Sequence, residues 1–413
     1  MRILEVSRYK NNFADHQLPF VTEQGEAIRD YLNRGLEIGD CKLENEPSAV
    51  DYFLVKGNYL KAVGALKAKI REFKPDIVHA HFGLSAITVE LQSLVPVVTT
   101  FHNGETLNWR VNFLSSLFSL RAKHVIYVAQ HIRDLSYFKA KNYSIIPCGV
   151  PMDQCVVMDK EEARRRLGWD AKKKYILFGG AFDNLRKNYK LLAEAVDIIE
   201  NKNKENTADA AINIEKQELT KNDESKVTCS NSNSLNPQSS HEQAPGQPDA
   251  QSCSDTDKSY LLDSSEKKSD FQSLQKNTKN NIEIIEMRGL SRAECVLRMN
   301  ACDLFALPSH SEGSPQALKE AMACNCPCLA TDIADVRELF GDEPGHWILR
   351  NPRKTHERWD ADEKSLDEMV ALLKEALAFE GRTNGRKRIE ELQLTNEAVA
   401  KRIVNIYNEI LKR

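Results

Sequence analysis

The sequence lacks several features that would place it in other protein classes. No run of about 18 apolar residues occurs in its 413 residues, so no transmembrane helix is predicted. The first residues, Met1 to Val6, lack the apolar core and the cleavage site of a signal peptide and predict a strand instead. The net charge of −3 gives no bulk attraction to nucleic acid, so we expect no nucleic-acid partner.

Cysteine is present, but without the regular spacing of a disulfide framework. The ten scattered cysteines fit a reduced, cytoplasmic protein. Cys324, Cys326 and Cys328 are close enough in sequence to suggest a zinc site. Their alternation is more typical of a turn that leads into a buried strand, where cysteine acts as a small hydrophobic residue. We therefore favour a packing role for these three residues.

Two stretches of alternating strand-like and helix-like segments predict an α/β protein. The strand-like segments are residues 3–7, 75–81, 97–102, 124–128 and 143–147 in the first stretch, and 175–180, 282–285, 303–307 and 327–331 in the second. Such alternation is typical of parallel sheets covered on both faces by helices. We predict two doubly wound domains, residues 1–150 and 151–394, followed by an amphipathic C-terminal helix within residues 395–413.

Residues 201–280 interrupt the second stretch. They contain one tyrosine, one phenylalanine and no tryptophan, and they are crowded with polar residues. A segment of this composition cannot bury enough apolar surface to offset the entropy of ordering it. We predict a disordered insertion, and a binding arm that folds on a protein partner is the alternative.

Glu312 and Glu320 form the most informative pair in the sequence. The strand-like segment 303–307 precedes them, and Pro315 suits the first turn of a helix because a missing N–H costs nothing there. Residues 316–323 are rich in helix formers. Glu312 is therefore expected in the loop above a strand end and Glu320 about one turn into the next helix, at the edge where open α/β sheets bind ligands. The N–H groups at the start of that helix would hold an anion.

The surroundings of this pair resemble a known signature. Glu312-x7-Glu320, followed by Ala321-Met322-Ala323-Cys324 and Thr331-Asp332, resembles the E-x7-E signature of retaining glycosyltransferases of family 4, of the polysaccharide-biosynthesis type. The resemblance implies the GT-B fold: two Rossmann-like domains that face a cleft, with a C-terminal helix that crosses back to the first. It also implies that Glu312 meets the donor sugar and Glu320 the ribose of the nucleotide. Two solvated acids are the alternative.

A histidine at the end of a predicted strand is the second feature of the resemblance. His102 follows the run Val97-Val98-Thr99-Thr100-Phe101, at a strand end where ligands of open sheets commonly bind. The resemblance implies that His102 lies between donor and acceptor. A strand-end histidine bonded to backbone is the alternative. We interpret His79 and His81, on the preceding strand, as structural.

A glycine turn followed by two cations is the candidate site for the donor's diphosphate. Gly179 and Gly180 would let the backbone approach a phosphate, and Arg186 and Lys187 would offset its charge. In the resembling family an arginine follows the glycine, whereas Ala181 stands there. Either Arg186 replaces that arginine, or the diphosphate is held by one cation fewer. A solvated Arg-Lys pair is the alternative.

The residues after the first glutamate also depart from the family pattern. Ser314 and Pro315 stand where an apolar residue and a glycine are usual, and Ala334-Asp335 replaces a double glycine. Because Pro315 has no N–H to offer, the expected donor contacts at the helix start are Ser314, Gln316 and Ala317. These departures leave the identity of the donor sugar undetermined.

Residues 109–123 predict an amphipathic helix that carries apolar and basic side chains. Trp109 and Phe113 are among its apolar residues, and Arg110 and Arg121 among its basic ones. Because acceptors in the resembling family are often lipid-linked saccharides, peripheral contact with the inner face of a membrane is one interpretation. We favour the other, in which the helix packs on its own sheet.

The residues and the resemblance together predict an enzyme. It would move a sugar from a nucleotide-sugar to a hydroxyl of a glycan or a lipid-linked saccharide, with retention at the anomeric carbon. No metal or other cofactor is expected, because cationic side chains and helix N-termini would stabilise the departing diphosphate. Two alternatives stay open: a non-catalytic GT-B subunit that binds nucleotide or glycan, and a nucleotide-sugar epimerase.

Overall fold

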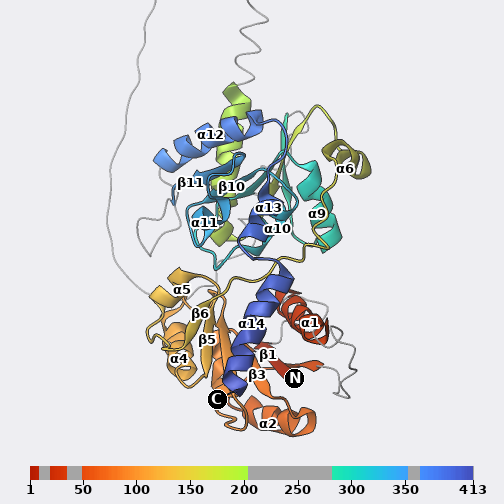
Figure 1. The fold of residues 1–413 in the computed structure, drawn as a ribbon. Helices are drawn as coiled ribbons and strands as arrows, with labels where there is room; N and C mark the ends of the chain where they lie inside the picture. Colours follow the sequence, from red (N-terminus) through yellow and green to blue (C-terminus); the bar gives the residue numbers. More distant parts are fainter. Residues whose placement is uncertain (9–18, 35–48, 203–280, 352–362, 413) are drawn as a thin grey trace, which may run out of the picture. The chain divides into compact units, whose positions relative to one another are not determined.

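The computed structural model describes residues 1–8, 19–34, 49–202, 281–351 and 363–412. The insertion predicted at residues 201–280 lies almost entirely outside the described residues. Within the described part of the chain, the elements form two parallel sheets, each flanked by helices (Figure 1). The α/β class and the two parallel-sheet domains predicted from sequence are confirmed.

The first sheet has six parallel strands in the order β2-β1-β3-β4-β5-β6. The strands are β1 (Arg2–Arg8), β2 (Ala49–Val55), β3 (Ile77–His81), β4 (Val97–Phe101), β5 (His124–Tyr127) and β6 (Tyr143–Ile145). The helices between them are α1 (Pro19–Arg34), α2 (Ala62–Phe73), α3 (Gly83–Glu90), α4 (Trp109–Ser119) and α5 (Gln130–Leu135). Strand β2 was not predicted from the sequence. It pairs with β1 at one edge of the sheet.

Successive residues of the strands face opposite layers of helices. Ile77 packs in a cluster with Ile28 of α1 and Tyr407 of the C-terminal helix. Val78, the next residue of β3, packs in a different cluster with Leu66 of α2. Since side chains alternate across a strand, a sheet covered on both faces must be apolar at both sets of positions. This explains why β3 and β4 are buried along their whole length.

The second sheet has five parallel strands in the order β11-β10-β9-β7-β8. The strands are β7 (Lys174–Phe178), β8 (Ile282–Glu286), β9 (Leu304–Leu307), β10 (Cys328–Thr331) and β11 (His346–Leu349). Its helices are α6 (Lys160–Leu167), η1 (Leu185–Lys187), a helix at residues 189–202, α9 (Arg292–Ala301), α10 (Gln316–Ala323), α11 (Val336–Phe340), α12 (Glu363–Ala378) and α13 (Gly385–Glu391). β8 pairs with β7 along its length. The second sheet therefore continues with β8, which begins two residues after residue 280.

The cysteines near β10 pack in the core of the second sheet, as predicted. Cys324, Cys326 and Cys328 are fully buried within one apolar cluster. The Sγ atom of Cys302 lies 3.3 Å from that of Cys326. Burial raises the pKa of the Cys328 thiol well above its usual value, which keeps it neutral among its apolar neighbours.

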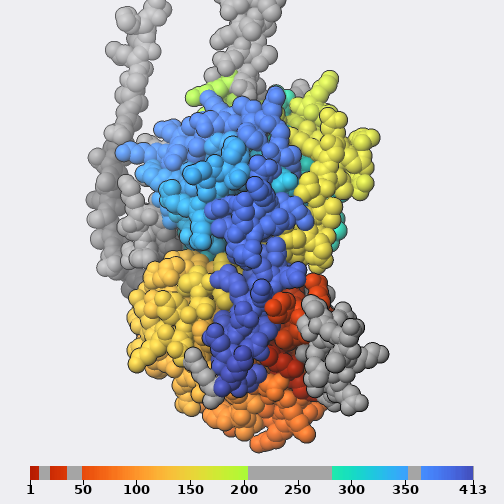
Figure 2. Space-filling view, viewed as in Figure 1, coloured from red at the N-terminus to blue at the C-terminus, as the bar shows by residue number. Residues whose placement is uncertain are grey.

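The C-terminal helix α14 (Asn396–Leu411) packs on the first sheet, as the resemblance implied. Ile403 and Tyr407 share an apolar cluster with Val98 of β4. A hydrogen bond joins the residue before Thr395 to the segment that follows β6: the N–H of Val150 donates to the Leu394 carbonyl at 2.8 Å. Figure 2 shows the dark blue surface of α14 against the red surface of α1.

Candidate active site

A cavity of about 540 Å³ gathers most of the predicted site residues. Cavities of this size are typical of small-molecule sites. The predicted residues that line it are His102, Arg186, Lys187, Glu312, Ser314, Gln316 and Ala317. Gly180 and Glu320 are not among its lining residues. The structure therefore brings His102, which follows a strand of the first sheet, together with six residues from the loops and helices of the second sheet.

A glycine allows the loop after β9 to approach the end of β4. A Cβ atom added to Gly313 would lie 2.5 Å from the carbonyl oxygen of His102, which is closer than real Cβ contacts. Asn103, with a positive φ of 99°, donates from its side-chain nitrogen to Ser311 Oγ at 3.3 Å. Only glycine fits this contact, which places Glu312 near the strand end that carries His102.

Glu312 is paired with both predicted cations. Lys187 Nζ lies 2.7 Å from Glu312 Oε1, and Arg186 Nη1 lies 3.7 Å from Glu312 Oε2. Gly180 supports this arrangement from outside the cavity, because an added Cβ would lie 2.7 Å from the Lys187 side chain. The predicted second cation beside Lys187 is thus present in the cavity, although Ala181 occupies the usual arginine position.

The start of α10 combines two departures from the family pattern. Ser314 Oγ donates a hydrogen bond of 2.6 Å to Asp335 Oδ2. Ala334 has a φ of 52°, a left-handed conformation in which glycine is favoured. Gln316 donates from its side chain to the Gly149 carbonyl at 2.6 Å. The N–H groups of the first turn of α10 have no partners within the helix, so they can bind an anion.

Glu320 lies apart from the cavity and is paired with an arginine that the sequence analysis did not single out. Arg292, the first residue of α9, places Nη1 2.6 Å from Glu320 Oε1 and also pairs with Glu23 of α1. Burial raises the pKa of Glu23. No sequence motif marks Arg292, because the three residues come from distant parts of the chain. A ribose bound at Glu320 would have to share it with this cation.

Aromatic side chains enclose His102. Its ring centroid lies 5.0 Å from that of Phe20 and 4.8 Å from that of Phe82. Burial, with additional contributions from His81 and Lys319, lowers the pKa of His102 well below its ordinary value. The imidazole is therefore neutral at pH 7 and can take part in hydrogen bonds without carrying a charge.

The other polar contacts of His102 fix its backbone and ring. Its N–H donates to the Glu105 carboxylate at 3.3 Å, and Glu105 also accepts from the N–H of Gly83 at 2.7 Å. The ring nitrogen Nε2 lies 3.1 Å from His81 Nδ1, and Nδ1 lies 3.6 Å from Cys148 Sγ. The predicted strand-end histidine is thus held at both its backbone and its side chain.

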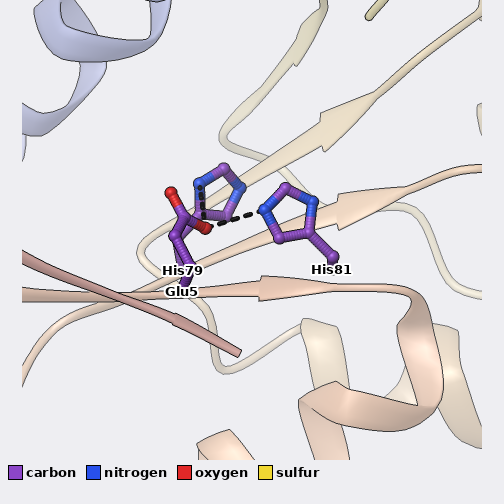
Figure 3. A group of neighbouring side chains, drawn as sticks. All are labelled: Glu5, His79 and His81. Carbon is purple, nitrogen blue, oxygen red and sulfur yellow. Dashed lines mark hydrogen bonds and ion pairs between the residues drawn. The ribbon is translucent and has the colours of Figure 1, made fainter. Parts of the chain in front are cut away.

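The two histidines of β3 lie in a buried polar cluster with Glu5 of β1 (Figure 3). His81 Nε2 lies 2.7 Å from Glu5 Oε2, and His79 bonds through its two nitrogens to Thr100 Oγ1 at 2.7 Å and to the Tyr407 hydroxyl at 2.6 Å. The donor set would suit a metal ion, but these hydrogen bonds occupy the nitrogens that face Glu5. The expectation that no metal takes part stays a prediction.

Helix α4 contradicts the favoured expectation for its apolar face. The side chains buried in α4 are polar, namely Asn112, Ser115, Ser116 and Ser119. The exposed large apolar side chains are Trp109, Phe113, Leu114, Leu117 and Leu120. Small residues allow the reversed orientation, because a Cβ added to Gly83 of α3 would lie 2.3 Å from Ser115 Cβ. The prediction that α4 packs its apolar face on the sheet was therefore wrong.

Among the described residues, none of the helices combines the length and the apolar character needed to cross a membrane.

The two parallel-sheet α/β domains have the architecture of the GT-B class. Two family models match the chain: Glycosyltransferase Family 4 over residues 44–154 and Glycosyl transferases group 1 over residues 261–361. Together they match just over half of the chain. The chain therefore belongs to the GT-B glycosyltransferases that join these two domains. This assignment favours the predicted transferase over an epimerase.

Two curated relatives are similar over short stretches. The glycosyltransferase TuaC of Bacillus subtilis (strain 168), named for teichuronic acid biosynthesis, is 51% identical over 41 residues. N,N'-diacetylbacillosaminyl-diphospho-undecaprenol alpha-1,3-N-acetylgalactosaminyltransferase of Campylobacter jejuni (serotype O:2, strain ATCC 700819 / NCTC 11168) is 27% identical over 123 residues. The matched stretches cover 10% and 30% of both this chain and the respective relative.

Solved structures share the fold over nearly the whole chain. Sucrose-phosphate synthase from Thermosynechococcus elongatus has a TM-score of 0.61 at 14% identity, and 100% of this chain and 99% of that one are covered. Anabaena HepE in complex with UDP-glucose has a TM-score of 0.59 at 12% identity, with 99% and 100% covered. At these identities the likeness establishes the fold alone.

Proposed function

We propose that this protein transfers a sugar from a nucleotide-sugar to a hydroxyl of a glycan or lipid-linked saccharide, with retention of anomeric configuration. The proposal rests on one observation: Lys187, Glu312 and His102 line the same cavity. Cations and a helix start suit a diphosphate, and the carboxylate and the imidazole suit sugar hydroxyls.

The ion pair between Lys187 and Glu312 suggests how the donor binds. A diphosphate carries more charge than one carboxylate, so it would compete for Lys187 Nζ and for Arg186. Glu312, released from its cation, would then accept hydrogen bonds from sugar hydroxyls. As the glycosidic bond breaks, negative charge grows on the diphosphate, and the two cations stabilise it most at that point. In this proposal the two cationic side chains supply the electrostatic stabilisation of the leaving group.

Retention of configuration is proposed from the resemblance of Glu312-x7-Glu320 to the signature of retaining glycosyltransferases of family 4. In the donor complex proposed above, Glu312 accepts hydrogen bonds from sugar hydroxyls and has no role as a nucleophile at the anomeric carbon. We therefore infer substitution on the same face of the sugar without a covalent glycosyl-enzyme. His102 would bond to the sugar near the reacting carbon.

The proposed acceptor is a saccharide carried on a lipid or a growing polysaccharide. The names of the two curated relatives refer to teichuronic acid and to a diphospho-undecaprenol substrate. Helix α4 offers an independent argument, because it exposes Trp109, Phe113 and Leu117 together with Arg110 and the nearby Arg121. Apolar and basic side chains on one exposed helix suit an anionic lipid surface. We propose peripheral contact of α4 with the cytoplasmic face of a membrane.

Flotation with lipid vesicles tests this contact. The protein should float with vesicles that contain phosphatidylglycerol and stay behind with pure phosphatidylcholine. The double variant Trp109→Ser/Phe113→Ser should lose flotation, whereas Leu60→Ser, a change at another exposed leucine, should keep it. Equal flotation of the double variant and the unchanged protein would overturn the proposal.

Measuring the release of free nucleoside diphosphate distinguishes a transferase from a non-catalytic binding subunit. A thermal-shift screen of nucleotide-sugars would first select the donor, and release would then be measured with and without lipid-linked acceptor. His102→Ala should lower turnover by about a hundredfold, while nucleotide affinity changes little. A protein that binds the donor but releases no nucleotide with any acceptor would be the non-catalytic subunit.

A further inference from the structure

Three side chains form a hydrogen-bonded row that ends at the cavity. Glu5 Oε2 lies 2.7 Å from His81 Nε2, and His81 Nδ1 lies 3.1 Å from His102 Nε2. The side chains of Glu5 and His81 are fully buried, whereas His102 lines the cavity. The row therefore connects a buried carboxyl group with the candidate active site.

The Glu5–His81 pair is buried where a net charge would be costly. Among the described residues, the ion-pair partners of Glu5 are His81 and, at 3.6 Å, His79. Burial lowers the pKa of His79 well below its ordinary value, so His79 is neutral, and its nitrogens bond to Tyr407 and Thr100. An uncompensated charge is costly in such surroundings. A pair with no net charge avoids this cost, and in such a pair one proton is shared between Glu5 Oε2 and His81 Nε2.

This shared proton sets the direction of the next hydrogen bond. Whether it rests on Glu5 Oε2 or on His81 Nε2, His81 carries a proton on Nδ1. That proton is donated to His102 Nε2, so the single proton of the neutral His102 ring must lie on Nδ1. We propose that Glu5 and His81 are positioning residues that hold His102 as an Nδ1–H donor toward the substrate. The consequence for transfer rests on the proposed function, whereas the tautomer does not.

The contacts of His102 show what this donor would serve. Nδ1 faces Cys148 Sγ at 3.6 Å, and Cys148 also lines the cavity. Sulfur is a weak acceptor, so an oxygen of a bound sugar would replace it as the partner. The rings of Phe20 and Phe82 offer no acceptor in the plane of the imidazole. His102 would therefore donate to a sugar oxygen without withdrawing a proton from one.

Nuclear magnetic resonance of the ligand-free, full-length protein tests the tautomer. With ¹⁵N-labelled histidine, long-range ¹H–¹⁵N correlations report which ring nitrogen carries the proton, and His102→Gln assigns the His102 signals. The unchanged protein should show His102 protonated at Nδ1. His81→Phe removes the donor to Nε2 and should shift His102 to a mixture of both tautomers, and Glu5→Met should do the same.

The matched control is His79→Phe, the same substitution on the same strand. His79 is as deeply buried as His81, and its replacement removes two hydrogen bonds, but none of the hydrogen bonds described for it is to His102. This variant should therefore keep the Nδ1–H tautomer. Protonation of His102 at Nε2 in the unchanged protein would overturn the proposal even if no variant folds. The proposal would also be overturned if His81→Phe left the tautomer of His102 unchanged.

Kinetics tests whether the row matters for transfer. His81→Phe should lower kcat by about tenfold or more with an unchanged KM for the donor, because a group that orients a catalytic histidine acts on the chemical step. His79→Phe should leave kcat close to that of the unchanged protein at temperatures where both are folded. An altered tautomer with unaltered kcat would overturn the positioning role. Absence of transfer in the unchanged protein, with the expected tautomer, would instead count against the proposed function.

Discussion

Ser314 and Asp335 form a 2.6 Å hydrogen bond, in which the serine hydroxyl donates to the carboxylate. Ser314 lies two residues before the start of α10, and Asp335 lies directly before α11. Each replaces a different residue of the family pattern, and each is in contact with the other. The two residues that differ from the family pattern are therefore hydrogen-bonded to each other at the proposed donor site. This pair is a candidate determinant of which donor sugar binds.

Removing the Ser314 hydroxyl should destabilise the protein. Burial raises the pKa of Asp335, and Ser314→Ala would take away the hydroxyl that bonds to it. The loss of a donor to a buried carboxyl group costs about 1–3 kcal/mol of the free energy of unfolding. Urea denaturation would measure it.

A double-mutant cycle separates this bond from general effects at the site. Ser314→Ala and Asp335→Ala should each destabilise the protein, and the double variant should lose less than the two single losses combined. Asp332→Ala is the control, since its partner Arg337 is exposed and surface ion pairs contribute about 0–1 kcal/mol. Additive losses at 314 and 335 would show that the bond contributes nothing.

Lys187→Ala should lower turnover more than it raises the KM for the donor. Lys187 Nζ lies 2.7 Å from Glu312 Oε1, and its proposed role is to stabilise the charge that develops as the diphosphate departs. Steady-state kinetics with the selected donor measures both constants. Lys190→Ala is the control, because that lysine is exposed and pairs only with Glu194 among the contacts described for it. A rise in KM with unchanged kcat would make Lys187 a binding residue.

Glu320→Gln should weaken nucleotide binding by about tenfold or more. A charge-assisted bond to ribose hydroxyls contributes about 1.5–3 kcal/mol, which corresponds to that change in the dissociation constant. Isothermal titration with the nucleoside diphosphate of the selected donor measures the affinity. Glu409→Gln, on the exposed side of α14, should bind as the unchanged protein does. An unchanged dissociation constant for Glu320→Gln would leave Glu320 as a partner of Arg292 alone.

Glu90 should make the protein less stable as the pH rises. It is buried at the end of α3, and burial raises its pKa from 4.5 to about 8. The unfolded chain therefore loses this proton at a lower pH than the folded protein. The stability contributed by the protonated group is complete below pH 4.5, declines between 4.5 and about 8, and is lost above that range.

Glu90→Gln should remove this dependence. At pH 8.5 the variant should exceed the unchanged protein by about 4–5 kcal/mol in free energy of unfolding, and at pH 4.5 the two should be nearly equal. Denaturation at the two pH values measures the difference. Glu72→Gln, at an exposed position of α2, should show no such gain. Equal stability of Glu90→Gln and the unchanged protein at both values would contradict the shifted pKa.

Local sequence determined the elements that carry the site. Apolar runs predicted β4 and β9, so His102 and Glu312 were both expected just beyond strand ends, where the structure has them. The proline and helix formers after Glu312 predicted α10, which begins at Gln316. Such features depend on neighbours in sequence, because strand and helix periodicity and turn chemistry act over a few residues.

Only the tertiary structure decided which distant residues meet. Glu5 lies opposite His79 because β1 pairs with β3, and no local pattern encodes the order of strands. The contacts of Ser314 with Asp335 and of Arg292 with Glu320 likewise join different elements. One charged residue within the apolar run of β1 was the available signal for Glu5.

The orientation of α4 shows the same limit. Its sequence identified an apolar and a polar face, but the apolar face is exposed and the serine face is buried against α3. Periodicity determines that a helix has two faces. Which face turns inward depends on the shape of the neighbouring helix, here on the space that Gly83 leaves for Ser115, and that is settled only when the chain packs.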